Sequence, residues 1–506
     1  MDTLMHLGTG FVAAVSPVNL LMAAIGAVLG TLVGVLPGLG PASAIAILIP
    51  LTSVLQPTPA IIMMAGIFYG AMYGGSTTSI LLNIPGEVAS VPTCIDGYPL
   101  AQQGRGGPAL GIAAIGSFIA GTLGVLGLTF FGPLLADQAL KFGPPEYFGL
   151  MILALTVIVG LSGGSLLKSL MMGCAGYLLS LGGIGPSSGF PRFNFGTTAL
   201  FGGLEMISVV IGLFAITEVF VGLEESRTAV SIKNIGSVYP SLKDLKISLP
   251  AILRGTGIGF FLGLLPGLSA AVTTFLAYDV EKKISRHPER FGKGAMEGVA
   301  SPESANNATS QAGFIPLMSL GIPASPTLAI LMGGLMLYGL QPGPLLFKDH
   351  PDFVWTVIAS MYIGNLILLV LNLPLVGLWA KMTTVPYGIM GPVILIISIV
   401  GAYTVNNSLF DIFTALVFGF LGYLMRKYQW PAVPLVLCFV LGPKLERSVI
   451  ESLAISAGDG RIFFQSSISL GLLITAAVML FISLRLVRRT EHRVKEVEGE
   501  IPLSPK

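Results

Sequence analysis

Charged residues are scarce in this chain, and their scarcity excludes a soluble globular protein. Only 10% of the 506 residues are Asp, Glu, Lys or Arg, against roughly 25% in soluble domains. No charged residue lies between Asp2 and Glu87, or between Glu303 and Lys348. Each gap could contain more than one membrane-crossing helix of ~20 residues. The apolar runs are continuous and do not alternate with period 2, so an all-α polytopic membrane protein is predicted rather than a β-barrel.

Cysteine and histidine are also few, and this argues against disulfide-stabilised and metal-dependent classes. Cys94, Cys174 and Cys438 show no CxxC spacing, and the four histidines fall in predicted loops or termini. No phosphate-binding loop, nucleophile elbow or zinc motif is present. We therefore expect no enzyme, no cofactor and no resident metal. The net charge of +2 comes from basic residues in short loops, so nucleic-acid binding is not expected either.

The apolar sequence is expected to form about ten to fourteen membrane segments. Uninterrupted candidates are residues 108–132, 147–167, 198–222, 353–379, 386–403, 408–424 and 466–484. Lys and Arg are enriched on the cytoplasmic side of bacterial inner membranes. On that basis the central linker (231–253) and the C-terminal tail (486–506) are predicted to be cytoplasmic. The N-terminus lacks the basic start of a signal peptide.

One apolar stretch is predicted to be a re-entrant hairpin. Residues 255–278 lie between Arg254 and the pair Lys282–Lys283. If both flanks are cytoplasmic, this stretch cannot cross the membrane once. It must enter, turn near Pro266–Gly267 and leave on the same side.

The turn of this hairpin has a counterpart 229 residues earlier. Residues 30–40 and 259–269 share the pattern G-x-x-x-G-x-L-P-G-L followed by Gly or Ser. Each copy precedes a second polar, Pro-broken element, Ser76–Ser79 before Asn83-Ile84-Pro85-Gly86 and Asn306–Ser310 before Gly321-Ile322-Pro323-Ala324. Interrupted hydrophobic segments at corresponding positions of two halves indicate the binding site of a transporter.

The flanking charges predict that the two halves have inverted topology, because the first turn has uncharged flanks and the second a basic one. The predicted domains are a first half at 1–230 with a hairpin around 18–50, and a second half at 254–485 with the hairpin 255–278, a broken polar helix 301–325 and scaffold helices 353–484. The alternative is that the G-x-x-x-G spacing serves only helix packing.

A membrane site for an anion can be built from helix N-termini, whose first backbone N–H groups are free and whose dipole is positive. Glycine and small residues let the backbone approach the ligand closely, and hydroxyl and amide groups add hydrogen bonds. The candidate substrate-binding residues are Pro37, Gly38, Leu39, Gly40, Ser43, Ser76, Thr77, Thr78, Asn83, Pro266, Gly267, Leu268, Ser269, Asn306, Asn307 and Ser310. The alternative for any single Ser or Thr is a hydrogen bond to its own helix backbone.

A coupling cation, Na⁺ or H⁺, is the only ion expected. Its candidate ligands are the oxygen-bearing side chains Glu303, Asn306, Asn307 and Thr309. Glu303 either relays protons or orients the two asparagines. The alternative for Glu303 is an ordinary carboxylate at the membrane interface.

These motifs resemble the large membrane subunit of the tripartite tricarboxylate transporter family. The resemblance is carried by the two L-P-G-L turns, by YGGSTTSILLNIPG (73–86) and by residues 301–344, and it extends over about residues 10–485. The chain has Ser301 and Ser304 where Ala is expected, while Glu303, Asn306 and Asn307 are in place. The resemblance implies an ion-driven symporter that works with a small membrane subunit. It also implies a periplasmic solute-binding protein that delivers carboxylates such as citrate.

Two other classes remain open from the sequence. One is an unpartnered ion-coupled anion transporter or exporter. The other is a membrane-embedded enzyme, which would need catalytic acids or histidines within the apolar core, and no convergent set of these is found.

Overall fold

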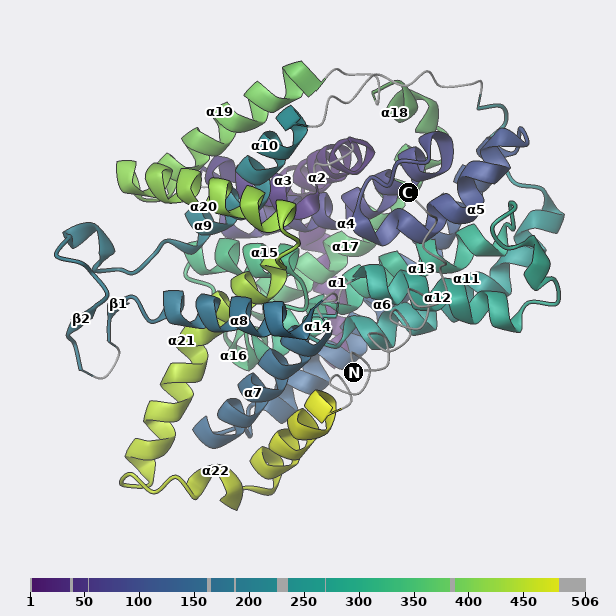
Figure 1. Ribbon diagram of the computed structural model, residues 1–506. Coiled ribbons are helices and arrows are strands. Elements are labelled where there is room, and N and C mark those ends of the chain that lie inside the picture. The colour runs from purple at the N-terminus through teal and green to yellow at the C-terminus, as the bar shows by residue number, and fades with distance from the viewer. Residues whose placement is uncertain are drawn as a thin grey trace, which may run out of the picture. The chain divides into compact units, whose positions relative to one another are not determined.

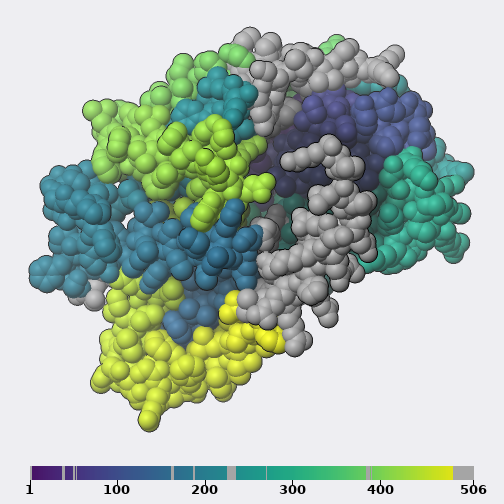
Figure 2. All heavy atoms as spheres, in the orientation of Figure 1, coloured from purple at the N-terminus to yellow at the C-terminus, as the bar shows by residue number. Residues whose placement is uncertain are grey.

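The computed structural model describes residues 2–36, 40–52, 54–161, 165–185, 188–224, 235–268, 270–382 and 387–481 (Figures 1 and 2). The chain forms two compact units. Unit 1 comprises residues 1–141 and 204–427, and unit 2 comprises 142–203 and 428–506. This division by contacts cuts across the two halves defined by the sequence repeat, and both repeat motifs belong to unit 1.

All the regular secondary structure in the described residues of unit 1 is helical. Its elements are α1 (Asp2–Ala14), α2 (Pro17–Val35), α3 (Pro41–Thr52), α4 (Pro57–Leu82), η1 (Val88–Ser90), α5 (Val91–Gln102), α6 (Gly106–Ala139), α9 (Met206–Val210), η3 (Ile211–Ile216), α10 (Thr217–Glu224), α11 (Leu242–Gly263), α12 (Ala270–Ile284), η4 (Pro288–Arg290), α13 (Glu297–Ala312), α14 (Phe314–Leu320), α15 (Pro326–Leu337), α16 (Pro344–Asp349), α17 (Pro351–Asn372), α18 (Val376–Met382), α19 (Tyr387–Asn406) and α20 (Leu409–Lys427).

Unit 2 is built mainly from three helices that pack on one another. Its elements are α7 (Pro144–Leu161), α8 (Leu166–Ser180), β1 (Gly183–Ile184), β2 (Pro191–Arg192), η2 (Thr198–Leu200), α21 (Ala432–Ile455), α22 (Ile462–Gln465) and a helix at Ser467–Phe481. Helix α21 packs against α7 and α8, and Arg192, the last residue of β2, forms an ion pair with Glu446 of α21 through two hydrogen bonds. The short antiparallel pair β1–β2 is the only departure from an all-α fold in the described part of the chain.

Seven described helices are long and apolar enough to cross a membrane, which agrees with the predicted polytopic fold. They are Pro17–Val35, Pro57–Leu82, Gly106–Ala139, Met206–Glu224, Leu242–Gly263, Pro351–Asn372 and Leu409–Lys427. Six shorter apolar helices accompany them. Large apolar side chains such as Phe413 and Phe420 of α20 are exposed, and the segment that contains α20 lies on the visible surface of unit 1 (Figure 2). Apolar exposure of this kind suits contact with lipid.

Several helix boundaries differ from the sequence prediction. The predicted span 198–222 is divided, with a π-helical stretch (η3) between α9 and α10. The predicted span 353–379 ends at Asn372 and resumes at Val376. Helix α21 was missed because its charged residues, such as Glu446 and Arg447, interrupt the apolar pattern.

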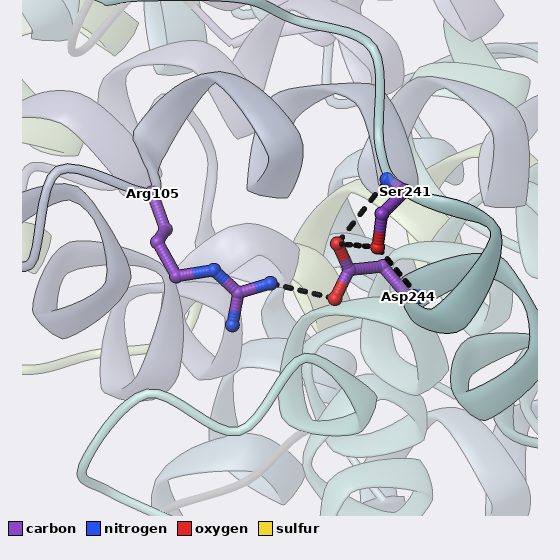
Figure 3. Close-up of polar contacts among 3 residues, drawn as sticks. All are labelled: Arg105, Ser241 and Asp244. Atoms are coloured by element: carbon purple, nitrogen blue, oxygen red, sulfur yellow. Dashed lines mark hydrogen bonds and ion pairs between the residues drawn. The ribbon is translucent and has the colours of Figure 1, made fainter.

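Helix α11 begins at Leu242, inside the range 231–253 that was predicted to be a linker. Ser241 and Asp244 form a capping box, in which the Ser241 hydroxyl accepts the Asp244 N–H and the Asp244 carboxylate accepts the Ser241 N–H. Arg105, just before α6, donates to the same carboxylate at 2.6 Å (Figure 3). The start of α11 is thereby attached to the start of α6.

The sequence repeat corresponds to a structural repeat in unit 1. Helix α2 packs closely on α4, and α11 packs closely on α13. In each half a shorter helix, α3 or α12, follows the Pro-Gly motif, and α11 and α12 pack together as a helical hairpin. Whether either hairpin enters and leaves the membrane on one side remains a prediction.

Glycines at equivalent positions allow the close packing in both halves. They are Gly26, Gly30 and Gly34 on α2, and Gly255, Gly259 and Gly263 on α11. A Cβ at Gly30 would lie 2.6 Å from the carbonyl oxygen of Ile67 on α4, and one at Gly259 would lie 2.3 Å from that of Ala305 on α13. The G-x-x-x-G part of the motif therefore does serve helix packing, as the alternative interpretation proposed, and the Pro-Gly part follows it as a separate feature.

Candidate functional site

The two polar, Pro-broken elements of the repeat meet inside unit 1. Ser76 on α4 donates its hydroxyl proton to Oε2 of Glu303 on α13, with an O–O distance of 2.5 Å. Thr93 on α5 donates to the other carboxylate oxygen, Oε1, at 2.5 Å. Ser76 and Glu303 are 4% and 0% exposed. The hydrogen bond between Ser76 and Glu303 therefore joins the two halves directly, as expected if both contribute to one site.

Glu303 is a buried carboxylate whose described partners are hydroxyl groups. None of the ion pairs found in the described residues includes Glu303. Burying an ionised carboxylate is costly unless hydrogen bonds or an opposite charge compensate it. Two hydroxyl donors supply part of that compensation and leave the negative charge itself unpaired.

Glu87 is a second carboxylate at this site, and the sequence analysis treated it as a loop residue. Its Oε1 accepts a hydrogen bond of 2.7 Å from Nδ2 of Asn306 on α13. Its carboxylate also accepts the backbone N–H of Ser90, the last residue of η1, and the Ser90 hydroxyl accepts a hydrogen bond from Ser79 on α4. Glu87 is half-buried. Its position at the end of an uncharged stretch of more than eighty residues was the available signal.

Buried polar atoms without hydrogen-bond partners gather on α13. They are Oγ of Ser304, Oδ1 of Asn306, Oδ1 of Asn307, and both Oε1 and Nε2 of Gln311, on side chains that are all 0% exposed. Buried polar atoms are almost always hydrogen-bonded in folded proteins. Such a set on one helix indicates a place where a ligand, an ion or water supplies the missing bonds.

The two predicted asparagines are both at the junction, with different neighbours. Asn307 donates from Nδ2 to the Ser117 hydroxyl on α6 at 2.7 Å and to the carbonyl oxygen of Glu303 at 3.1 Å. Asn306 faces Glu87 instead. The pair therefore connects α13 with α6 on one side and with the segment before α5 on the other.

Asp96 on α5 fixes the chain that leads into α13. Its Oδ1 accepts three backbone N–H groups, from Gly292, Gly294 and Ala295, each at 2.8 Å. Its Oδ2 accepts the hydroxyl proton of Tyr278 on α12 at 2.8 Å. Asp96 is completely buried, and the sequence analysis did not identify it, because its partners lie about two hundred residues away in the chain.

The second Pro-Gly turn contacts the broken element of its own half. Gly267 has a φ of 77°, a conformation that glycine adopts without steric cost, and its N–H donates to the carbonyl oxygen of Ala324 at 3.0 Å. Pro266 is partly exposed and Leu268 is buried. One backbone N–H of this turn is thus already bonded within the protein.

The broken elements end in the same way in the two halves. Helix α4 ends at Asn83, with a φ of 58°, and α14 ends at Gly321, with a φ of 67°. Both left-handed residues are followed by Ile-Pro. Asn83 is exposed and acts as a helix end, and no ligand role for its side chain is visible in the structure.

Three of the predicted hydroxyl residues bond to the backbone. Thr309 donates to the carbonyl oxygen of Ala305 at 2.7 Å and lies 3.1 Å from that of Gly259. Ser310 and Thr78 donate to the carbonyl oxygens of Asn307 and Gly75. These are the bonds expected of Ser and Thr within helices, so ligand roles for these hydroxyls stay predictions.

No hydrogen bond joins the remaining predicted residues that the structure describes to either carboxylate, and ligand roles for them stay predictions. Ser43 and Thr77 are buried on α3 and α4, and Gly40 precedes α3, where a Cβ would meet no atom within 4 Å. Pro37, Gly38, Leu39 and Ser269 lie outside the described residues.

Comparison with known proteins identifies the family. The model of the tripartite tricarboxylate transporter TctA family matches residues 20–437. An Agrobacterium vitis protein described as "Uncharacterized 52.8 kDa protein in TAR-I ttuC' 3'region" is 45% identical over 485 residues, which cover 96% of this chain and 97% of that protein. A second, "Uncharacterized protein in TAR-II ttuC' 3'region", is 46% identical over 226 residues, covering 45% of this chain and 93% of its own length. No solved structure matches the chain.

Proposed function

The chain belongs to the tripartite tricarboxylate transporter TctA family, and on that premise we propose that it is the large permease subunit of a three-part importer. The importer takes up tricarboxylates, such as citrate, or related carboxylates, and an ion gradient drives it as a symporter. Its other parts are a small membrane subunit and a periplasmic solute-binding protein that delivers the substrate. The chain is placed in the bacterial inner membrane with its C-terminus in the cytoplasm, and it catalyses no covalent reaction.

The unsatisfied amides of α13 are the observation that carries this proposal. Gln311 has a buried amide nitrogen without a partner, and a carboxylate is a suitable acceptor for it. Neutral donors bind an anion without a fixed positive charge, so the substrate can also leave, as transport requires. The positive end of the α12 helix dipole, after the Pro-Gly turn, is the second candidate contribution to anion binding.

The polar residues first singled out in the two halves keep their proposed roles within this scheme. Ser76, Asn306 and Asn307 line the junction of the two broken elements, where substrate and ion are proposed to bind. The Pro-Gly turns are proposed to lie beside the substrate, where their glycines let the backbone approach it closely. Na⁺ and H⁺ both remain candidates for the coupling ion.

The alternative function is an unpartnered ion-coupled anion transporter or exporter. The tripartite proposal requires a solute-binding protein for uptake, and the alternative does not. Reconstitution with and without that protein therefore distinguishes the two proposals. The chain and its small membrane partner are placed in proteoliposomes, and accumulation of labelled di- and tricarboxylates is measured with and without the cognate solute-binding protein.

The tripartite proposal expects accumulation of a carboxylate only when the binding protein and an inward ion gradient are both present. Equal accumulation without the binding protein would support the unpartnered alternative. Absence of carboxylate transport in every combination, with correctly folded protein, would refute the proposed substrate class.

A further inference from the structure

Two carboxyl groups at the junction are connected through one asparagine. Glu303 and Asn306 are three residues apart on α13, so their side chains lie on the same face of the helix. Asn306 uses its amide nitrogen to bond Glu87, and Glu303 is held by hydroxyls from α4 and α5. Segments from both halves of the repeat therefore hold two acidic groups near one carboxamide.

The charge of this pair is not compensated by the neighbouring elements. Arg254 on α11 is engaged by both oxygens of Glu281, and Arg105 is paired with Asp244. The other titratable groups on helices packed against α13 include Asp96, which is fully hydrogen-bonded, and Tyr73, whose hydroxyl donates to Asn365. Cys94 on α5 donates weakly to the carbonyl oxygen of Ser90. Both arginines are thus engaged by other carboxylates, and Asp96, Tyr73 and Cys94 carry no positive charge.

The orphaned oxygen of Asn306 gives an independent reason to expect a ligand. Its Oδ1 is completely buried and has no donor among the described residues. Because Nδ2 of the same planar group bonds Glu87, Oδ1 is held beside the carboxylate and cannot rotate away without breaking that bond. The surrounding groups are oxygens of carboxylate, carboxamide and hydroxyl type, which are the ligands of hard cations and the acceptors of protons.

We propose that Glu87, Glu303 and Oδ1 of Asn306 bind one coupling cation, a proton or a sodium ion, and that its binding is what allows the carboxylate substrate to bind nearby. This inference rests on the proposed function and names its coupling site. Without the cation, two negative groups repel an incoming carboxylate. With the cation, the net charge falls and the unpartnered amide nitrogen of Gln311 on α13 can donate to the anion. The linkage is reciprocal, because each ligand raises the affinity for the other.

Neutral isosteres test this mechanism, since Glu87→Gln and Glu303→Gln imitate the cation-bound charge. Each variant is reconstituted with the small membrane subunit and the binding protein. Two activities are measured, namely gradient-driven accumulation and substrate exchange at equilibrium without a gradient. Asp411→Asn, a buried carboxyl of α20 that bonds Asn406, is the matched control.

The proposal expects accumulation to fall in both Gln variants while exchange continues and loses its dependence on the coupling cation. Asn306→Ala should raise the concentration of cation needed for half-maximal uptake by about 5–150-fold, the usual range of coupling between two ligands. A shift along the pH axis identifies the proton, and a shift along the Na⁺ axis identifies sodium. The control should keep wild-type coupling.

Wild-type coupling in both Gln variants would overturn the inference. Loss of exchange together with accumulation, in variants that elute and melt like the wild type, would overturn it as well, because the carboxyls would then serve the substrate or the scaffold. A wild-type protein that transports no carboxylate would refute the proposed function instead, so the two failures are distinguishable.

Discussion

Some residues near this site stabilise the backbone that carries the site and do not bind a ligand themselves, and Asp96 is an example. Its carboxylate satisfies three backbone N–H groups of the segment 292–295, which leads into α13. That segment has no regular secondary structure to satisfy those groups itself. The position of Asn306 and Glu303 therefore depends on a side chain that touches neither of them.

Asp96→Ala should destabilise the protein strongly. A buried N–H left without a partner costs about 1–3 kcal/mol; three N–H groups would lose their acceptor, and that of Ala295 is buried. Asp96→Asn keeps an oxygen acceptor for the N–H groups and should cost much less. Thermal unfolding of detergent-purified protein measures the difference. Equal melting temperatures for the Ala and Asn variants would show that these hydrogen bonds do not hold the segment.

Glu303 could be found from the sequence, Glu87 had only its place at the end of an uncharged stretch as a signal, and Asp96 had none. Glu303 interrupts an apolar and small-residue context, and an acid in such a context is rare enough to attract attention. Glu87 and Asp96 belong to a short charged stretch that looks like an ordinary loop. Their roles depend on contacts with residues about two hundred positions away in the chain. Glu87 bonds Asn306, and Asp96 bonds the 292–295 segment. A single sequence carries no record of such pairing.

At the scale of helices, α11 and α13 show that local sequence motifs can predict where a helix breaks and how closely it packs. The Pro-Gly motif, the Ile-Pro breaks and the glycine spacing are all visible in the sequence, and in the described residues α2 packs on α4 as α11 packs on α13. The breaks in 198–222 and 353–379 were not predicted, because both stretches remain apolar across them. Hydropathy reports burial in lipid and does not report whether the backbone hydrogen bonds continue.

Two glycines of α11 offer a matched test of the packing. Gly259→Ala would place a Cβ 2.3 Å from a carbonyl oxygen of α13, so the helices must separate, at a cost of about 1–3 kcal/mol or more. Gly257→Ala would meet no atom within 4 Å and should stabilise the helix by up to ~1 kcal/mol.

The expected result is opposite changes in melting temperature, with Gly259→Ala lower and Gly257→Ala equal to or higher than the wild type. Similar decreases in both variants would mean that α11 and α13 do not pack this closely in the folded protein.

At the scale of the whole molecule, the sequence predicts which side of the membrane each end of the two hairpins faces. The repeat lies within unit 1, and its two halves are predicted to have opposite orientations because only the second hairpin has a basic flank. Exposed positions on each side of the hairpins allow a direct assay. Lys243 and Lys283 flank the second hairpin, and Val18 and Val54 flank the first.

Single cysteines at Lys243 and Lys283 should react with a membrane-impermeant reagent only from the cytoplasm. Single cysteines at Val18 and Val54 should react only from the periplasm, because the halves are predicted to be inverted. The background is a variant without native cysteines that retains uptake. Reaction of Lys243Cys and Lys283Cys from opposite sides would exclude the re-entrant hairpin, and reaction of all four positions from one side would exclude the inversion.

The central claim is that the α4–α13 junction is the transport site of a carboxylate importer. Asn307 and Asn372 are both buried asparagines with an unpartnered Oδ1. Asn307 lies at the junction, whereas Asn372 lies on α17, where its Nδ2 contacts Thr31. Truncating either one removes the same chemical group, so the comparison separates a site effect from a general loss of a buried amide.

The measurement is gradient-driven carboxylate accumulation in proteoliposomes that contain both membrane subunits and the binding protein, normalised to folded protein. Loss of a buried hydrogen-bonding group at the site is worth about 1–3 kcal/mol, so Asn307→Ala should lower the rate about tenfold or more. Asn372→Ala should retain most of the wild-type rate per folded molecule. Equal rates for Asn307→Ala and the wild type, or equal losses in the two variants, would contradict the assignment of the transport site to this junction.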